Sequence, residues 1–269
     1  MKFLFIFLFL MGAKSPADLP YKTVTFPSAD GLEITADLYH KYPHDAPFLI
    51  LFHQAGYSRG EYRDIALKLN EIGFNALAVD LRSGNEVNKV VNETAKRAAE
   101  KNLPDSYLDA LPDMMAAINF VKNNYASRQV IIWGSSYSAA LVLKIAGDNP
   151  GLVSGVIAFS PGEYFERLGK SATFIEESAR KIEIPVFITS AKNEKDRWWS
   201  IYQAIPSKKK SYFLPQSDGI HGSRALWDST PDNQQYWDAV KKFLQNFVET
   251  MPPRTPGNLD KIKIWIKIL

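Results

Sequence analysis

Short apolar runs that alternate with helical stretches constrain the fold of this chain more than any other feature of its sequence. Residues 47–52 (PFLILF), 75–80 (NALAVD) and 129–133 (QVIIW) each contain an uninterrupted apolar stretch. This pattern is typical of strands that are buried on both faces of a parallel sheet. We expect strands at residues 21–26, 32–39, 47–52, 75–80, 129–133, 155–159, 185–190 and 211–214.

Helical periodicity fills the segments between these strands. Ser58 and Glu61 have the spacing of a capping box, which predicts a helix from Ser58 through Leu69. Further helices are predicted at residues 107–125, 137–146, 175–181 and 234–248. The first two strands flank turn-forming residues 28–31 and are expected to form an antiparallel hairpin. The pattern predicts an α/β fold with a doubly wound, mostly parallel sheet in one domain over residues 21–250.

Composition excludes several classes of protein and site. With 46% hydrophobic and 23% charged residues, the 269-residue chain is not disordered, fibrous or coiled-coil. The net charge is only +3 and basic residues are scattered, so nucleic acid is not an expected partner; the basic run 208–210 is interpreted as a solvated turn. The absence of Cys excludes a thiol nucleophile and a Cys-ligated metal. Because metal-binding motifs and nucleotide-binding loops are also missing, no cofactor or metal is expected.

Three segments stand outside the strand–helix pattern. Residues 1–13 carry one Lys and then an apolar run ending in Gly12-Ala13, which is typical of a short signal peptide and predicts export to the periplasm or outside the cell. The alternative is an uncleaved N-terminus attached to the membrane surface, since the run is too short to span a bilayer. Residues 84–105 are polar and are a candidate lid or partial helix. Residues 252–269 could form an edge strand, a membrane or partner contact, or a poorly ordered end.

The most informative motif is Gly134-Ser135-Ser136-Tyr137-Ser138, which joins a buried strand to a predicted helix. A nucleophile elbow needs this context, because its serine lies on a sharp strand-to-helix turn with small residues two positions to either side. Ser136 is therefore the candidate nucleophile. Ser138 stands where such motifs usually have Gly, but it is still small.

With these motifs the chain resembles the α/β-hydrolase superfamily, and within it the serine esterases and dienelactone-hydrolase-like proteins, over residues 21–250. The resemblance rests on the elbow, on the Asp30-Gly31-Leu32 hairpin and on His53-Gln54-Ala55-Gly56, Val79-Asp80-Leu81-Arg82-Ser83-Gly84 and a late His-Gly. It implies an α/β-hydrolase fold, a mostly parallel eight-stranded sheet with helices on both faces.

The resemblance also implies a base and an acid for Ser136. The family order is nucleophile, acid, base, and among four His only His221 follows Ser136. The acid is expected after the strand at 185–190, where Glu194 is preferred and Asp196 is the alternative. Glu163 is a third candidate, because some relatives place the acid after the sixth strand.

The oxyanion hole is expected to combine the backbone N–H groups of Tyr137 and Ala55, with Gln54 as the alternative donor. His53 and Asp80 are interpreted as structural residues. The large apolar residues after the acid and after the sixth strand either line an acyl pocket or belong to the core: Phe165, Leu168, Trp198, Trp199 and Tyr202.

These residues predict a serine hydrolase that cleaves carboxylic esters through an acyl-enzyme. A dienelactone hydrolase proper has Cys as nucleophile, so Ser136 favours ordinary esters. Acyl transfer to an acceptor other than water, and a non-catalytic binding protein of the same fold, are the alternatives. The expected partner is a small-molecule ester, with membrane contact only through the termini. The sequence leaves the physiological substrate and the oligomeric state open.

Overall fold

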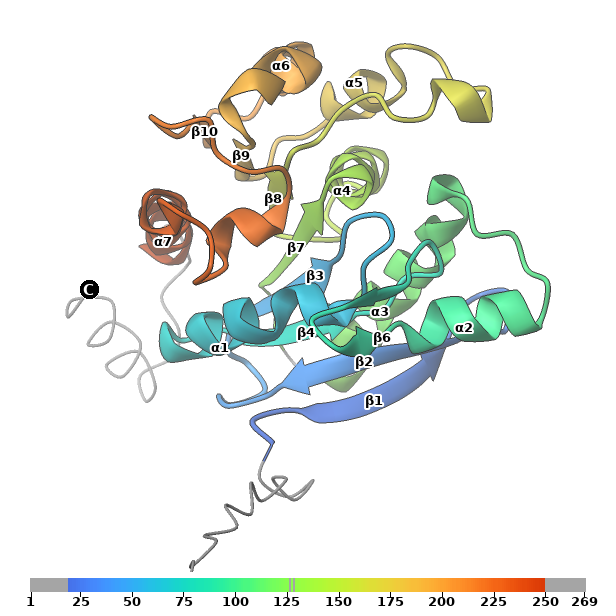
Figure 1. Ribbon diagram of the computed structural model, residues 1–269. Coiled ribbons are helices and arrows are strands. Elements are labelled where there is room, and N and C mark those ends of the chain that lie inside the picture. Colours follow the sequence, from blue (N-terminus) through green and yellow to red (C-terminus); the bar gives the residue numbers. More distant parts are fainter. Residues whose placement is uncertain (1–18, 126, 128, 250–269) are drawn as a thin grey trace, which may run out of the picture.

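The predicted mixed sheet is present, and its strand order is β1-β2-β4-β3-β7-β8-β9-β10 (Figure 1). The computed structural model describes residues 19–125, 127 and 129–249. The strands are β1 Lys22–Pro27, β2 Glu33–Tyr39, β3 Phe48–Phe52, β4 Asn75–Val79, β7 Val130–Ser135, β8 Gly155–Phe159, β9 Val186–Thr189 and β10 Lys210–Phe213. β2 pairs antiparallel with β1 and with β4, whereas all other neighbours are parallel. The expected α/β-hydrolase architecture is confirmed.

Helices cover both faces of this sheet. They are α1 Arg63–Glu71, α2 Glu93–Glu100, α3 Leu111–Asn124, α4 Tyr137–Asp148, α5 Phe174–Ala179, α6 Lys195–Ala204 and α7 Asn233–Glu249. Short 3₁₀ turns are η2 Arg59–Tyr62, η3 Tyr107–Ala110, η4 Glu166–Leu168, η5 Lys192–Glu194 and η6 Ser223–Leu226. Helix α6 was not among the predicted helices, and it directly follows the predicted acid.

The side chains of the continuous apolar runs belong to two separate hydrophobic cores, one on each face of the sheet. In β3, Phe48, Ile50 and Phe52 belong to one core, while Leu49 and Leu51 belong to the other. Successive side chains of a strand point to opposite faces, so a strand buried on both sides needs apolar residues at every position. This is the physical reason for the uninterrupted runs.

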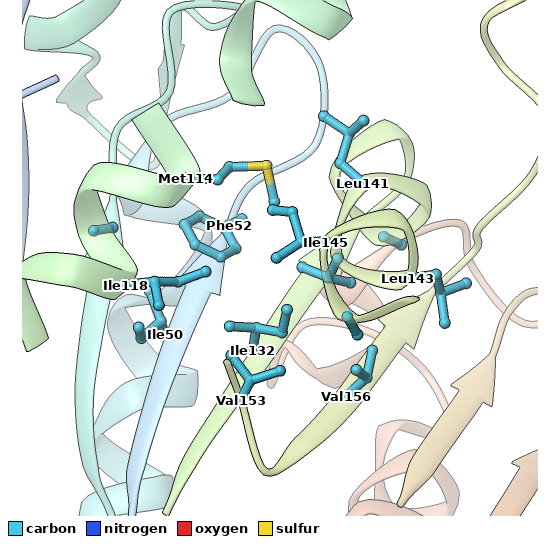
Figure 2. Packing of buried hydrophobic residues seen from close by; sticks show 14 of the residues in the cluster. Ile50, Phe52, Met114, Ile118, Ile132, Leu141, Leu143, Ile145, Val153 and Val156 are labelled. Atoms are coloured by element: carbon cyan, nitrogen blue, oxygen red, sulfur yellow. The ribbon is translucent and has the colours of Figure 1, made fainter. Parts of the chain in front are cut away.

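The first core lies between the sheet and helices α3 to α6. Figure 2 shows Met114 and Ile118 of α3 and Ile145 of α4 facing Ile50 and Ile132 of the central strands. Complete burial of such a side chain contributes roughly 1.5–3 kcal/mol. This packing fixes α4, and α4 in turn fixes the turn that precedes it.

The second core lies under α1, η6 and α7. Leu69 of α1 and Trp237 of α7 are buried there with Trp133 of β7. The indole N–H of Trp237 donates to the carbonyl of Leu226 at 2.9 Å, which ties α7 to η6. The segment that contains His221 is thereby attached to the domain just after that residue.

The predicted capping box at Ser58 and Glu61 is wrong. The Ser58 hydroxyl accepts the Gly60 N–H at 3.1 Å, but the Glu61 carboxylate turns inward to other donors. Glu61 is fully buried, so the spacing that resembles a surface cap has a different cause. The α-helix itself begins at Arg63.

Residues 84–105 are better ordered than their polar sequence suggests. They form a hairpin of β5 Glu86–Val87 and β6 Val90–Val91, followed by α2. The Asn92 amide donates to the carbonyl of Leu81 at 2.9 Å, and its oxygen caps α2 by accepting the Ala95 N–H at 2.8 Å. The hydroxyl of the fully buried Thr94 accepts the N–H of Thr35 on β2 at 2.9 Å. These contacts attach the segment to the antiparallel end of the sheet, and its role as a lid stays a prediction.

Both termini lie outside the described residues, and with them the predicted signal peptide of residues 1–13 and the tail of residues 252–269. Over the part of the chain that the structure describes, no helix has the length and apolar character needed to cross a membrane.

Asn92→Ala is expected to lower the free energy of unfolding by about 1–3 kcal/mol, because it removes a helix cap and leaves the buried Leu81 carbonyl without a donor. Chemical denaturation measures this loss. Asn85→Ala is the matched control, since Asn85 is exposed on the same segment. Equal stability of the two variants would contradict the anchoring role of Asn92.

Candidate active site

Ser136 lies on the sharp turn between β7 and α4. Its backbone has φ +61° and ψ −120°, a conformation that L-residues rarely adopt and that costs roughly 1–3 kcal/mol. Three backbone hydrogen bonds hold this conformation: the Ser136 N–H donates to Phe159 O at 2.8 Å, and Ser136 O accepts the N–H groups of Ala139 at 2.9 Å and Ala140 at 3.2 Å. The side chain is only partly exposed at the carboxyl edge of the sheet.

Gly134 and Ser138, the small residues on either side of Ser136, are required for different physical reasons. A Cβ atom on Gly134 would lie 2.3 Å from the backbone oxygen of Ser138, so only Gly fits there. The Ser138 hydroxyl accepts the Ser135 N–H at 2.8 Å and donates to Phe52 O at 2.8 Å. Ser138 thus replaces the usual Gly with a side chain that ties the turn to the end of β3.

His221 and Glu194 form a hydrogen-bonded pair. The distance from His221 Nδ1 to Glu194 Oε1 is 2.6 Å. Burial acts to raise the pKa of Glu194, but hydrogen bonds from His221 and Ser160 outweigh it and hold this pKa below its ordinary value. An ionised carboxylate at Nδ1 fixes the imidazole tautomer and leaves Nε2 as the basic nitrogen.

Ser160 connects this pair to the rest of the site, and the sequence analysis missed it. Its hydroxyl donates to Glu194 Oε2 at 2.7 Å and accepts the Gly222 N–H, next to His221, at 2.9 Å. Ser160 directly follows β8 and has φ +56°. A serine immediately after a buried strand, before Pro161-Gly162, is the one signal in the sequence that could have identified it.

The other two candidate acids lie elsewhere. Asp196 is exposed on the first turn of α6. The carboxylate of Glu163 accepts the N–H groups of Ile175 and Glu176 at 2.9–3.0 Å, which caps the N-terminus of α5. Of the three predicted carboxylates, the one that the fold brings to His221 is Glu194.

The candidate oxyanion donors differ in whether their backbone N–H groups already have a hydrogen-bond acceptor. The Gln54 N–H donates to Glu61 Oε2 at 2.8 Å, so this alternative donor is occupied by a buried carboxylate. Ala55 follows it in the same loop and is partly exposed. Tyr137 is the first residue of α4, where N–H groups have no intrahelical acceptor and the helix dipole favours negative charge.

Glu61 is a carboxylate that the sequence analysis did not place in the site. It is completely buried, and its Oε1 accepts the Ser135 hydroxyl at 2.8 Å. Burial raises its pKa to about 7, against hydrogen bonds from Gln54 and Ser135 that favour the charged form.

His53 and Asp80 have the contacts of structural residues. His53 Nδ1 donates to Gln54 O at 2.8 Å, while Nε2 accepts the Leu81 N–H at 2.8 Å. Burial lowers the pKa of His53 to about 4, so the ring is neutral near pH 7. Asp80 accepts the backbone N–H of Arg59 at 2.7 Å and pairs with its guanidinium at 2.6 Å.

Aromatic residues near the site belong mostly to the core. Trp198 and Phe165 are buried in the first core, and the Trp198 indole donates to Ser190 Oγ at 2.8 Å. Tyr164, not singled out from the sequence, lies near the Ser136 side chain and donates its hydroxyl to Ser160 O at 2.7 Å. Burial raises the pKa of Tyr164 to about 12, so a neutral phenol lies beside the candidate nucleophile.

No group of three or more His, Asp or Glu within residues 19–125, 127 and 129–249 is arranged to hold a metal ion.

A family model described as Hydrolase_4, serine aminopeptidase S33, matches residues 43–164, a segment that includes Ser136 but ends before Glu194 and His221. No curated protein matches the chain.

Solved structures with the same fold include an esterase, Pf2001 of Pyrococcus furiosus, with TM-score 0.65 and 18% identity over 87% of this chain and 96% of that one. Est1E of Butyrivibrio proteoclasticus, solved with ferulic acid bound, has TM-score 0.64 and 15% identity over 82% and 98% of the two chains. Dienelactone hydrolase of Anabaena variabilis has TM-score 0.63 and 13% identity over 87% and 100%. At these identities the similarity establishes the fold.

The buried His53 should make stability depend on pH. The pKa of His53 in the folded protein, about 4, lies below the ordinary value of 6.5. The stabilisation that neutral His53 gives the folded state is therefore fully present above pH 6.5 and is lost as the pH falls through 4. The free energy of unfolding of the wild type should therefore fall by on the order of 3 kcal/mol more than that of His53→Gln between these pH values.

Urea unfolding at a series of pH values measures this difference. His44→Gln is the control, because His44 is exposed and should follow the wild-type curve. Parallel curves for the wild type and His53→Gln would contradict a neutral, buried His53.

Proposed function

We propose that this chain, which has the α/β-hydrolase fold, is a serine hydrolase that cleaves small-molecule carboxylic esters. The observation that carries the proposal is the 2.6 Å hydrogen bond between His221 Nδ1 and Glu194 Oε1, formed at the same sheet edge as the strained turn of Ser136. A serine hydroxyl is a poor nucleophile without a base, and a base needs a third group to orient it. The proposal assigns the role of nucleophile to Ser136, of base to His221 and of acid to Glu194.

In the proposed reaction, Ser136 Oγ attacks the ester carbonyl while His221 Nε2 accepts its proton. Glu194 stabilises the imidazolium that forms. The tetrahedral intermediate then collapses, and the alcohol leaves with the proton from Nε2. Water attacks the acyl-enzyme with His221 again as base, which releases the acid and regenerates Ser136.

The negative oxygen of the intermediate would be held by the N–H groups of Ala55 and Tyr137. Tyr137 begins α4, so the positive end of that helix dipole adds to the stabilisation. Such donors are effective because they are already oriented before charge develops.

Two alternatives share this fold. In an acyltransferase, another acceptor would replace water, and analysis of the products formed with an added alcohol separates it from a hydrolase. A non-catalytic binding protein has no chemical use for a paired His221 and Glu194. The structurally similar Pf2001 of Pyrococcus furiosus is an esterase, which supports ester cleavage as the first reaction to assay. Export through residues 1–13 is part of the same proposal.

A fluorophosphonate serine probe should label the folded wild type and fail to label Ser136→Ala, since the probe reacts only with an activated serine. Gel fluorescence of purified protein measures the labelling. Ser200→Ala is the control, because Ser200 is exposed on α6, and it should label like the wild type. A folded wild type that stays unlabelled would contradict the proposal and favour the binding protein.

Glu194→Gln should lower kcat/KM for a p-nitrophenyl ester by roughly 10³–10⁴-fold, because an amide does not fix the His221 tautomer or stabilise the imidazolium. Asp196→Asn is the matched control and should keep near wild-type activity, since Asp196 is exposed. The opposite ranking of the two variants would make Asp196 the acid.

A further inference from the structure

The buried carboxylate of Glu61 bonds to donors from distant parts of the chain. Oε2 accepts the Gln54 N–H at 2.8 Å, and Oε1 accepts the Ser135 hydroxyl at 2.8 Å. The Ser135 oxygen in turn accepts the Ser223 N–H at 2.9 Å. One side chain is therefore linked to residues 54, 135 and 223.

Each of these partners lies within two residues of a residue of the proposed mechanism. Gln54 immediately precedes the oxyanion candidate Ala55, and Ser135 immediately precedes Ser136. Ser223 lies two residues after His221. The three loops come from the ends of β3 and β7 and from the segment before η6, so the local sequence of any one loop does not fix its position relative to the other two.

We propose that Glu61 is a positioning residue, whose carboxylate sets the oxyanion loop, the nucleophile turn and the base loop relative to one another. The proposal rests on the proposed serine-hydrolase function, and it extends that function to a residue that touches none of the reacting atoms.

The surroundings of Glu61 favour this role over a purely packing one. Its carboxylate is removed from water, which is unfavourable for an acid unless each oxygen has a hydrogen-bond donor. Its backbone is also fixed, because the indole N–H of Trp227 donates to Glu61 O at 2.8 Å. An apolar side chain would fill the space but would leave the Gln54 N–H without an acceptor.

Glu61→Gln removes this function while conserving shape. A carboxylate accepts at both oxygens, whereas an amide has one accepting and one donating end. In the variant, either the Gln54 N–H faces an NH₂ group or the Ser135 hydroxyl loses its acceptor. Ser135→Ala is a second, narrower variant, because it keeps the Glu61–Gln54 bond and removes the two hydrogen bonds of the Ser135 hydroxyl, to Glu61 and to the Ser223 N–H.

Hydrogen–deuterium exchange tests the positioning without any substrate. In Glu61→Gln we expect faster exchange in residues 52–57 and 220–226, and in Ser135→Ala only in residues 220–226. Glu71→Gln is the control, because Glu71 is exposed at the end of α1, and its exchange should match that of the wild type. Unchanged exchange in both loops of Glu61→Gln would overturn the proposal.

Ester kinetics and fluorophosphonate labelling test the consequence. Glu61→Gln should lower kcat by about 10²-fold with KM within about twofold of wild type, since small displacements of reacting groups reduce rates by this order. A Glu61→Gln protein with wild-type kcat would overturn the proposal. If Glu61→Gln does not fold, Ser135→Ala decides alone: a lower labelling rate with faster exchange in residues 220–226 supports it, and wild-type behaviour overturns it. A wild type that does not label refutes the hydrolase function, while the exchange experiment still decides the role of Glu61.

Discussion

Polar groups at the carboxyl edge of this sheet are removed from water, so they must find partners in the protein. This constraint joins loops that are far apart in the chain. Ser160 bonds both Glu194 and the amide of Gly222, and Ser138 bonds the end of β3 to the Ser136 turn. The strained backbone of Ser136 persists because the elements around it are fixed by these bonds and by the two apolar cores.

Environment divides similar carboxylates into different roles. Hydrogen bonds from His221 and Ser160 hold the pKa of Glu194 low, which suits a group that stabilises an imidazolium. Glu61 is fully buried, and its pKa rises to about 7 although neutral donors bond it. Glu163 caps a helix and takes no part in this edge of the sheet. Residue type alone does not distinguish these roles, because desolvation and hydrogen bonding decide them.

Local patterns predicted the elements well where one physical cause dominates. All eight strands of the main sheet were expected near their observed positions. For the central strands β3, β4, β7, β8 and β9 the reason is burial on both faces, which requires apolar runs. Local patterns failed where tertiary contacts override them. The spacing of Ser58 and Glu61 matched a capping box, but the Glu61 carboxylate instead accepts hydrogen bonds from the buried Gln54 N–H and Ser135 hydroxyl. The polar segment 84–105 contains β5, β6 and α2, because Asn92 and Thr94 find buried partners.

The sequence by itself determined the doubly wound fold and the turn at Ser136, because strand burial and the small Gly134 leave a signature in consecutive residues. Only the tertiary structure decided which carboxylate meets His221 and what Glu61 bonds. Those pairings join residues separated by 27 positions for Glu194 and His221 and by 74 for Glu61 and Ser135. A hydrogen bond depends on distance and direction in three dimensions. The number of residues between two partners in the sequence therefore does not tell whether folding brings them together.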